Sequence, residues 1–156
     1  MAHIHQKIDF TVSVQIVHEN KVLLLIHKKL HIWLPPGGHI ELDEDPNEAA
    51  LREAKEETGI DVELVGEVQS YDSPYNAREL ILPRFLNRHF YDTERVHEHV
   101  DLCYFARPTS DVSKMRHEVE GEEIRWFTKE EIEKNEFDIV PDVRAHALAA
   151  LKELAS

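Results

Sequence analysis

The chain has 156 residues, a formal net charge of −13 and a hydrophobic fraction of 42%. This length suits one domain with a sizeable core, the composition argues against disorder, and no apolar run approaches the ~20 residues of a membrane span. So negative a chain opposes binding to a nucleic-acid backbone, because proteins that bind one usually carry a basic face.

The first ten residues lack the apolar core of a signal peptide, and the lone Cys103 cannot form an internal disulfide. We therefore expect a cytoplasmic protein. No linker, repeat or low-complexity tract divides the chain, so residues 1–156 are expected to form a single domain.

The first expected elements are two β-strands at residues 9–18 and 21–28, joined at Glu19 and Asn20 as an antiparallel hairpin. The second strand is nearly all apolar and should be central. The LPPGG segment at residues 34–38 then predicts a turn that leads into a helix over residues 46–58.

The ends of this helix are marked by capping residues. Asp45 is a good N-cap, Pro46 suits the first helical position, and Glu48 completes a capping-box pattern with Asp45. At the other end Gly59 can adopt the left-handed conformation, and Ile60 then supplies the apolar contact of a Schellman-type stop. We therefore expect a rigid helix.

Further strands and two more helices are expected after this helix. Thr128 with Glu131 makes a capping box, and Pro141 suits a first helical turn. The strands are predicted near residues 62–71, 79–91, 97–107 and 122–127, with a turn at 92–95, and the helices at 128–135 and 141–155. This order suggests an α/β fold, an α/β/α sandwich around a mixed β-sheet.

Three acids fall on one face of the helix at 46–58. Glu53, Glu56 and Glu57 lie within about 100° of one another on the helical wheel, as i, i+3 and i+4 neighbours do. A narrow stripe of Ala50, Ala54, Thr58 and Leu51 could press the helix against a sheet. Clustered like charges destabilise a helix by a few tenths of a kcal/mol. A bound divalent cation such as Mg²⁺, which prefers oxygen ligands, would offset that cost.

The stretch from Gly38 to Ile60, GHIELDEDPNEAALREAKEETGI, resembles the Nudix box. Gly38 is followed after five residues by Glu44 and after seven more by Arg52-Glu53, and Glu56, Glu57, Gly59 and Ile60 complete the pattern. With about one chance in ten to twenty at each fixed position, so complete a match is expected by chance at roughly 10⁻⁷ per start site. The resemblance implies a Nudix-like, MutT-like fold.

The resemblance implies hydrolysis of a pyrophosphate bond in a nucleoside diphosphate linked to another group X. Glu53, Glu56 and Glu57 would hold Mg²⁺, with Mn²⁺ as a substitute, and the carbonyl of Gly37 would join them. By the same resemblance Glu44 and Arg52 support these acids, Arg52 also reaching Glu48 and Glu56 on the helix. The alternative is a non-catalytic nucleotide-binding or regulatory module of the same fold, although such domains usually lose box acids and none is lost here. A solvated acidic helix ranks last.

The general base is left open, since it varies in this family. The candidate outside the box is Glu120, six residues before Trp126, and Glu118 and Glu123 compete with it. A solvated acidic loop is the plain alternative.

Histidines and cations supply the candidate substrate contacts. His97, His99 and Asp101 alternate onto one face of a strand, a spacing that could line a substrate cleft or bind a transition metal, or simply form a polar sheet face. His39 follows the glycine pair directly. Among the cations, Arg84 and Arg88 could contact phosphate, as could His27, Lys28 and Lys29, with surface charge as the plainer role.

The substrate itself is not determined by these patterns. Family markers downstream of the box point to ADP-ribose for a proline and to dinucleoside polyphosphates for a tyrosine, and here Pro74 and Tyr75 are adjacent, so the two hints cancel. Trp33 and Tyr75 could stack on a base or serve in packing. Many proteins of this family are dimers, so the resemblance implies a homodimer.

Overall fold

Strands β1 (Ile8–His18) and β2 (Lys21–Ile26) form the predicted antiparallel hairpin in the computed structural model, which describes residues 5–156. Glu19 and Asn20 have positive φ angles of 47° and 60°. Two such residues make a tight turn whose twist matches that of the flanking strands. β2 is central, as expected, because β1, β3 and β8 all pair with it.

The sheet is mixed. β1 runs parallel to β7 from the pair Ile8 and Glu98 to the pair Ile16 and Ala106, and the other strand pairs are antiparallel. The main strand order is β3-β2-β1-β7-β5, with β4 paired to β1, β6 to β7 and β8 to β2. The remaining strands are β3 (Trp33–Leu34), β4 (Gly37–His39), β5 (Val62–Leu64), β6 (Phe85–Phe90), β7 (Glu98–Pro108) and β8 (Ile124–Thr128).

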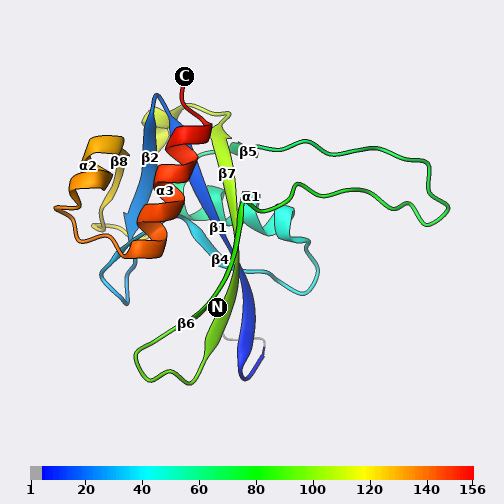
Figure 1. Ribbon diagram of the computed structural model, residues 1–156, viewed down its shortest axis with the longest axis horizontal. Helices are drawn as coiled ribbons and strands as arrows, with labels where there is room; N and C mark the ends of the chain where they lie inside the picture. Colours follow the sequence, from blue (N-terminus) through cyan, green and yellow to red (C-terminus); the bar gives the residue numbers. More distant parts are fainter. Residues whose placement is uncertain (1–4) are drawn as a thin grey trace.

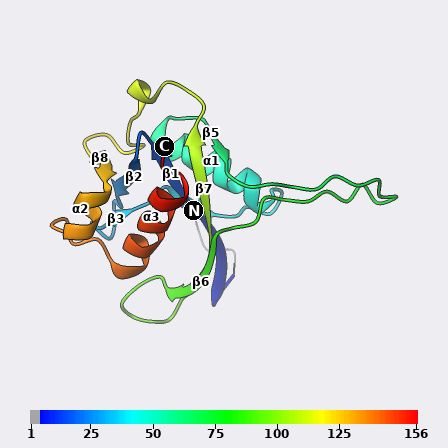
Figure 2. The same ribbon diagram turned by 45° about the horizontal axis from the view of Figure 1, so that its top comes forward.

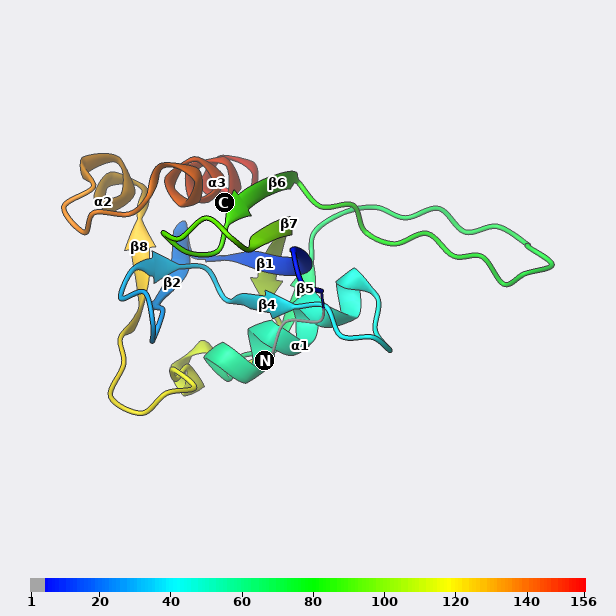
Figure 3. The same ribbon diagram turned by 90° about the horizontal axis from the view of Figure 1, so that it is seen from below.

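Helices cover both faces of this sheet, which confirms the α/β/α arrangement (Figure 1, Figure 3). α1 (Pro46–Thr58) packs on one face, and α2 (Lys129–Lys134) and α3 (Pro141–Glu153) on the other, with a short 3₁₀ helix at Val112–Lys114. Apolar side chains fill a separate core on each face. Among residues 5–156, no helix is long and apolar enough to cross a membrane.

Helix α1 begins and ends where its capping residues predict. The Asp45 side chain accepts from the Glu48 N–H, the Glu48 side chain accepts from the Asp45 N–H, and Gly59 is left-handed at φ 73°. Ala50, Ala54 and Thr58 are buried against the sheet, whereas Leu51 is 40% exposed. Leu51 was therefore wrongly placed in the packing stripe, and Ala49 is the further buried member.

Three predicted elements differ from the structure. The LPPGG segment is not a simple turn, because Gly37 pairs with Ser13 in β4. The strand predicted at 62–71 is only Val62–Leu64, and the strand predicted at 79–91 is only Phe85–Phe90. The residues between these two strands have no helix or strand.

Residues 65–84 instead form a long extended arm that leaves the body of the molecule and returns (Figure 2). Its base is anchored where the Asn47 side chain exchanges two hydrogen bonds with the backbone of Ile81. A turn at its far end is closed by the Asn76 N–H, which donates to the Ser73 carbonyl. Tyr75 lies in this turn and is 90% exposed.

Candidate active site

Helix α1 holds the three predicted acids beside the glycine pair of β4. The Gly37 N–H donates to Glu57 Oε2 at 2.9 Å, which brings that carboxylate against the backbone of β4. Glu53 lies against Gly38, and Glu56 is the outermost of the three, with 56% of its side chain exposed. The acids that the wheel grouped are therefore grouped in space.

Arg52 connects these acids to the loop before the helix. Its guanidinium donates to both oxygens of Glu44, at 2.9 and 2.6 Å, and to the carbonyl of His39 at 3.0 Å. It also donates to Glu53 at 2.8 Å and to Glu56 at 3.2 Å. Because a bidentate pair fixes both distance and plane, Arg52 can act as a template for the acids. The predicted contact with Glu48 is wrong, since that side chain caps the helix at Asp45.

The two glycines are required by close approach. A Cβ on Gly37 would lie 2.2 Å from the carbonyl oxygen of Val12, and a Cβ on Gly38 would lie 2.3 Å from Glu53 Oε1. Neither side chain could be accommodated without moving β1 or the Glu53 carboxylate. This explains why a glycine pair precedes the acidic helix.

Burial makes the acids costly to ionise without a counter-charge. Burial raises the pKa of Glu57 to about 8, and the neighbouring carboxylates of Glu53, Glu118 and Glu56 add to the rise. Burial also raises the pKa of Glu53, against the hydrogen bond from Arg52. The pKa of Glu44 is lowered, chiefly by its hydrogen bond from Arg52. Arg52 thus holds Glu44 as an anion, whereas no cation is among the groups that shift the pKa of Glu57.

This donor set fits a hard divalent cation. Glu57 accepts from the Gly37 N–H, Glu53 and Glu56 both accept from Arg52, and Glu53 and Glu56 raise the pKa of Glu57 electrostatically. A divalent cation would supply the positive charge that this raised pKa calls for. Glu53, Glu56, Glu57 and Gly37 are the residues predicted to hold the metal.

The acids open into a cleft of about 770 Å³ that runs across the sheet face beneath α3. Three polar residues of β1 that alternate along the strand line this cleft: Thr11, Ser13 and Gln15. Thr11 and Ser13 both donate to the carboxylate of Asp101 on β7, at 2.7 and 2.6 Å. Lys28 and Lys29 also line the cleft and supply cations. His27 lines it too, but burial and the two lysines lower the pKa of its imidazole, which favours the neutral form.

The loop that follows the 3₁₀ helix brings one more acid to the cleft. Glu118 lines the cleft, and its N–H donates to the carbonyl of Glu57 at 3.2 Å. His117 holds the loop in place, because its Nδ1 accepts from the Val119 N–H and its Nε2 contacts the Ile26 carbonyl at 2.9 Å. Glu120 is exposed and does not line the cleft.

The predicted substrate contacts separate into two groups. His39 and His99 line the cleft. Arg84 instead pairs with Glu153 at 2.8 Å and Arg88 with Glu98 at 2.6 Å, and neither lines the cleft. His97 is buried next to Asp9 rather than in the cleft wall.

Trp33 packs edge-on against Phe127 in the core, so its plain role as a packing residue is confirmed.

Gln15 is a candidate that sequence reasoning missed. It is completely buried, lines the cleft, and among the described residues neither its amide nitrogen nor its amide oxygen has a hydrogen-bond partner. A buried amide of this kind is costly unless a ligand or water satisfies it. The signal was in the sequence, where Thr11, Ser13 and Gln15 alternate with Val12 and Val14 and so mark a polar face of β1.

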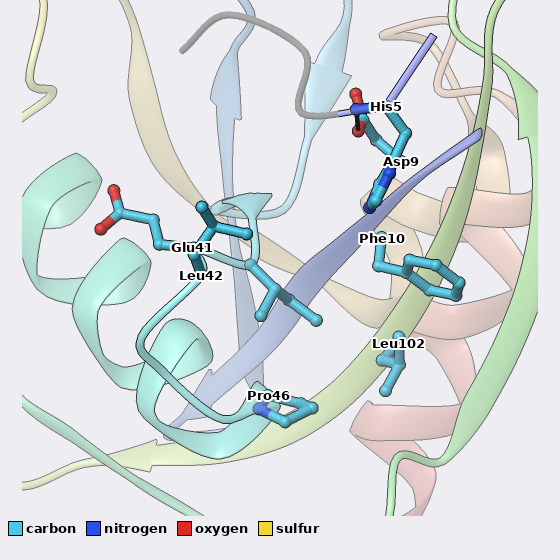
Figure 4. Close-up of a pocket in the computed structure, with 8 residues that line it drawn as sticks. His5, Asp9, Phe10, Glu41, Leu42, Pro46 and Leu102 are labelled. Atoms are coloured by element: carbon cyan, nitrogen blue, oxygen red, sulfur yellow. Dashed lines mark hydrogen bonds between the residues drawn. The ribbon is translucent and has the colours of Figure 1, made fainter. Parts of the chain in front are cut away.

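A second, smaller cavity of about 360 Å³ lies at the outer end of β1, between the sheet and the loop before α1. Figure 4 shows Phe10, Leu102 and Pro46 lining it, with His5 and Asp9 beyond Phe10. It is mainly apolar and does not include the acids of α1.

Comparisons with known proteins agree with this geometry. The family model described as the NUDIX domain matches residues 8–149. A crystal structure of a hydrolase of the NUDIX family from Clostridium perfringens is 36% identical, with a TM-score of 0.78, over 94% of this chain and 97% of that one.

Two curated proteins are similar over smaller parts. An RNA pyrophosphohydrolase of Roseobacter denitrificans is 32% identical over 125 residues, which is 76% of this chain and 72% of that protein. An m7GpppN-mRNA hydrolase of Xenopus laevis, NUDT17, is 41% identical over 64 residues, and this match spans only 22% of that protein. The match across residues 8–149, the sheet with helices on both faces and the glycine-bounded acidic helix together place this chain in the NUDIX family.

Proposed function

We propose that this chain is a Mg²⁺-dependent pyrophosphohydrolase that cleaves a phosphoanhydride bond in a nucleoside diphosphate linked to another group X. The observation that carries the proposal is that α1 places Glu53, Glu56 and Glu57 beside the glycine pair, with Glu57 bound by the Gly37 N–H and Arg52 fixing Glu53 and Glu56. Mn²⁺ should substitute for Mg²⁺, because it also accepts oxygen ligands.

When bound, the metal would neutralise phosphate oxygens and lower the pKa of an attacking water. The chain's own residues do the rest. Glu53, Glu56 and Glu57 would hold the metal with the carbonyl of Gly37, while Arg52 and Glu44 keep the carboxylates in place. Lys28 and Lys29 can meet further phosphate charge, and Gln15 offers an amide donor and acceptor to a base or sugar.

Several nucleotide classes remain candidates for the substrate. Similar proteins are named as a probable DHNTP pyrophosphohydrolase, an RNA pyrophosphohydrolase and an asymmetrical bis(5′-nucleosyl)-tetraphosphatase. Two of these names are pyrophosphohydrolases and the third is a tetraphosphatase, so all three describe the hydrolysis of phosphate linkages. The charge of −13 favours a small substrate over a long nucleic acid, because an extended phosphate backbone would be repelled over a larger surface.

The test is a substrate panel with purified protein and Mg²⁺. It should include canonical and oxidised nucleoside triphosphates, ADP-ribose, nucleotide sugars, dinucleoside polyphosphates and a 5′-triphosphate RNA, compared by kcat/KM. Glu53→Gln and Glu57→Gln should each lower kcat by about 10²-fold or more, because the substitution removes a ligand charge but keeps the shape. Glu67→Gln, on the exposed arm, is the matched control and should keep full activity.

Two results would overturn the proposal. Full turnover in both Glu53→Gln and Glu57→Gln would exclude these acids as the reaction site. Nucleotide binding without product release at any Mg²⁺ concentration would instead favour a non-catalytic binding module. Intact folding of both variants, checked by circular dichroism, separates a lost site from a lost structure.

A further inference from the structure

A second group of metal-binding side chains lies on the same sheet face as the cleft, nearer the outer end of β1. Asp9 on β1 is the cross-strand neighbour of His99 on β7, and His39 on β4 pairs with Thr11, two residues further along β1. Side chains two residues apart on a strand share a face. The parallel β1–β7 pair and the antiparallel β1–β4 pair therefore bring one carboxylate and two imidazoles together.

The donor atoms of the three side chains are close enough for one ion. The ligand atoms of Asp9, His39 and His99 all lie within 4.8 Å of one another, and His39 Nε2 is 3.3 Å from Asp9 Oδ2. For ligand bonds of about 2.0–2.1 Å at tetrahedral angles, two ligand atoms are separated by about 3.3–3.4 Å. The Asp9–His39 pair already has this separation, and the ligand atom of His99 lies within 4.8 Å of both.

The surroundings hold Asp9 in position. The His5 N–H donates to Asp9 Oδ1 at 2.8 Å, and His97 Nε2 contacts Oδ2 at 3.0 Å. The other nitrogen of His97 contacts the Gln6 carbonyl at 3.2 Å, so that ring is fixed at both ends. Outer partners of this kind orient metal-binding carboxylates and raise affinity. Asp9 is 1% exposed, so a charge here needs compensation from bound or neighbouring groups.

We propose that Asp9, His39 and His99 form a binding site for a transition-metal dication, with Zn²⁺ as the best match. Two imidazoles and one carboxylate suit Zn²⁺, whereas the all-oxygen set of Glu53, Glu56 and Glu57 suits Mg²⁺. Three protein ligands leave a fourth position for water or for a group of the substrate. The two sites meet at His39, whose carbonyl accepts from Arg52 while its ring lies beside Asp9.

The site also has a mechanical consequence. It would cross-link β1 to two of its neighbours, β4, which carries the glycine pair, and β7, so that bound Zn²⁺ should raise the melting temperature. This stabilisation and the Zn²⁺ affinity do not depend on turnover, so the Zn²⁺ site can be tested separately from the proposed hydrolase activity.

The experiment is isothermal titration of the full chain with Zn²⁺ in a saturating excess of Mg²⁺, which occupies the oxygen site. One equivalent should bind to the wild type. Loss of an outer partner of a metal ligand weakens metal affinity by about 10- to 100-fold, and we expect a loss of this size in His97→Gln. Asp9→Asn and His99→Gln each remove a ligand, so their Zn²⁺ affinity should fall by more than that.

Two controls test the location. Glu53→Gln should leave the Zn²⁺ affinity unchanged, because it alters only the oxygen site. His31→Asn removes an exposed imidazole in a positive-φ position that asparagine tolerates, and it should also have no effect.

X-ray absorption of the wild-type Zn²⁺ complex identifies the ligands of the ion directly, even if Asp9→Asn does not fold. Two imidazole ligands are expected. An all-oxygen shell would overturn the proposal, and so would wild-type Zn²⁺ affinity in His99→Gln or its loss in Glu53→Gln.

Discussion

At the scale of a single residue, the proposed metal site would couple proton binding to metal binding through Glu57. Its pKa of about 8 in the folded protein lies above the ordinary value of 4.5 for glutamate, because the carboxyl is buried among other acids. In the metal-free protein, the free energy of unfolding should therefore fall as the pH rises from the unfolded to the folded pKa, since the unfolded chain releases this proton first. A metal that binds the ionised carboxylate should oppose that loss.

We expect Mg²⁺ to raise the melting temperature more at about pH 8 than at about pH 6, because less work is then needed to remove the Glu57 proton. Thermal melts followed by circular dichroism, with and without Mg²⁺, measure this difference. Glu57→Gln should flatten both the pH dependence and the Mg²⁺ effect. A metal-free wild type that gains stability relative to Glu57→Gln over this range would contradict the expected sign.

Glu118 and Glu120 can be separated by a matched pair of substitutions. Glu118 lines the cleft and its carboxylate contributes to the raised pKa of Glu57, whereas Glu120 is exposed and does not line the cleft. We therefore expect Glu118→Gln to lower kcat by about 10-fold or more, and Glu120→Gln to leave it near the wild-type value. Steady-state kinetics on the best substrate of the panel decides. A larger loss of kcat in Glu120→Gln than in Glu118→Gln would instead favour Glu120 as the catalytic acid outside the Nudix box.

Helix α1 works as an element because small residues let it lie close to the sheet. Ala54 is completely buried and Leu51 is 40% exposed on the same helix. Ala54→Leu should overpack this contact and cost about 1–3 kcal/mol in the free energy of unfolding. Leu51→Ala should change it by only about 0.5 kcal/mol. Urea unfolding of the two variants makes the comparison, and an equal effect would mean that the helix is not held by close packing.

The bounds of α1 and its acidic face could be predicted because the signals are local. Asp45, Glu48 and Gly59 determine the ends of the helix from within a few residues, and the spacing of Glu53, Glu56 and Glu57 follows from helical geometry. Arg52 could likewise be assigned to support, since its main partners lie on the helix or in the loop that precedes it.

Contacts between distant elements could not be predicted in this way. Arg84 and Arg88 looked available to phosphate because nothing in the sequence indicates that Glu153 and Glu98 lie beside them. Asp9 was overlooked because its meeting with His39 and His99 depends on the parallel pairing of β1 with β7. The strand predicted at 79–91 was too long for the same reason, since only residues 85–90 pair with β7.

The arm at residues 65–84 is the feature that matters most at the scale of the whole molecule. It has twenty residues without helix or strand, and loops of more than about 12–15 residues are usually functional. Val68, Tyr71 and Leu82 are 53%, 49% and 72% exposed on it. Exposed apolar groups gathered on one projecting segment are typical of an interaction surface. This supports the homodimer that the family resemblance implies.

We therefore expect light scattering after size exclusion to give twice the monomer mass of 18.2 kDa for the wild type. The double variant Tyr71→Ser, Leu82→Ser should move toward the monomer mass, because burial of these side chains against a partner would contribute about 25 cal/mol per Å². Leu42→Ser, which removes an 88% exposed apolar side chain outside the arm, should leave the mass unchanged. A wild type at the monomer mass would refute the dimer, whereas a double variant that stays dimeric would place the interface elsewhere.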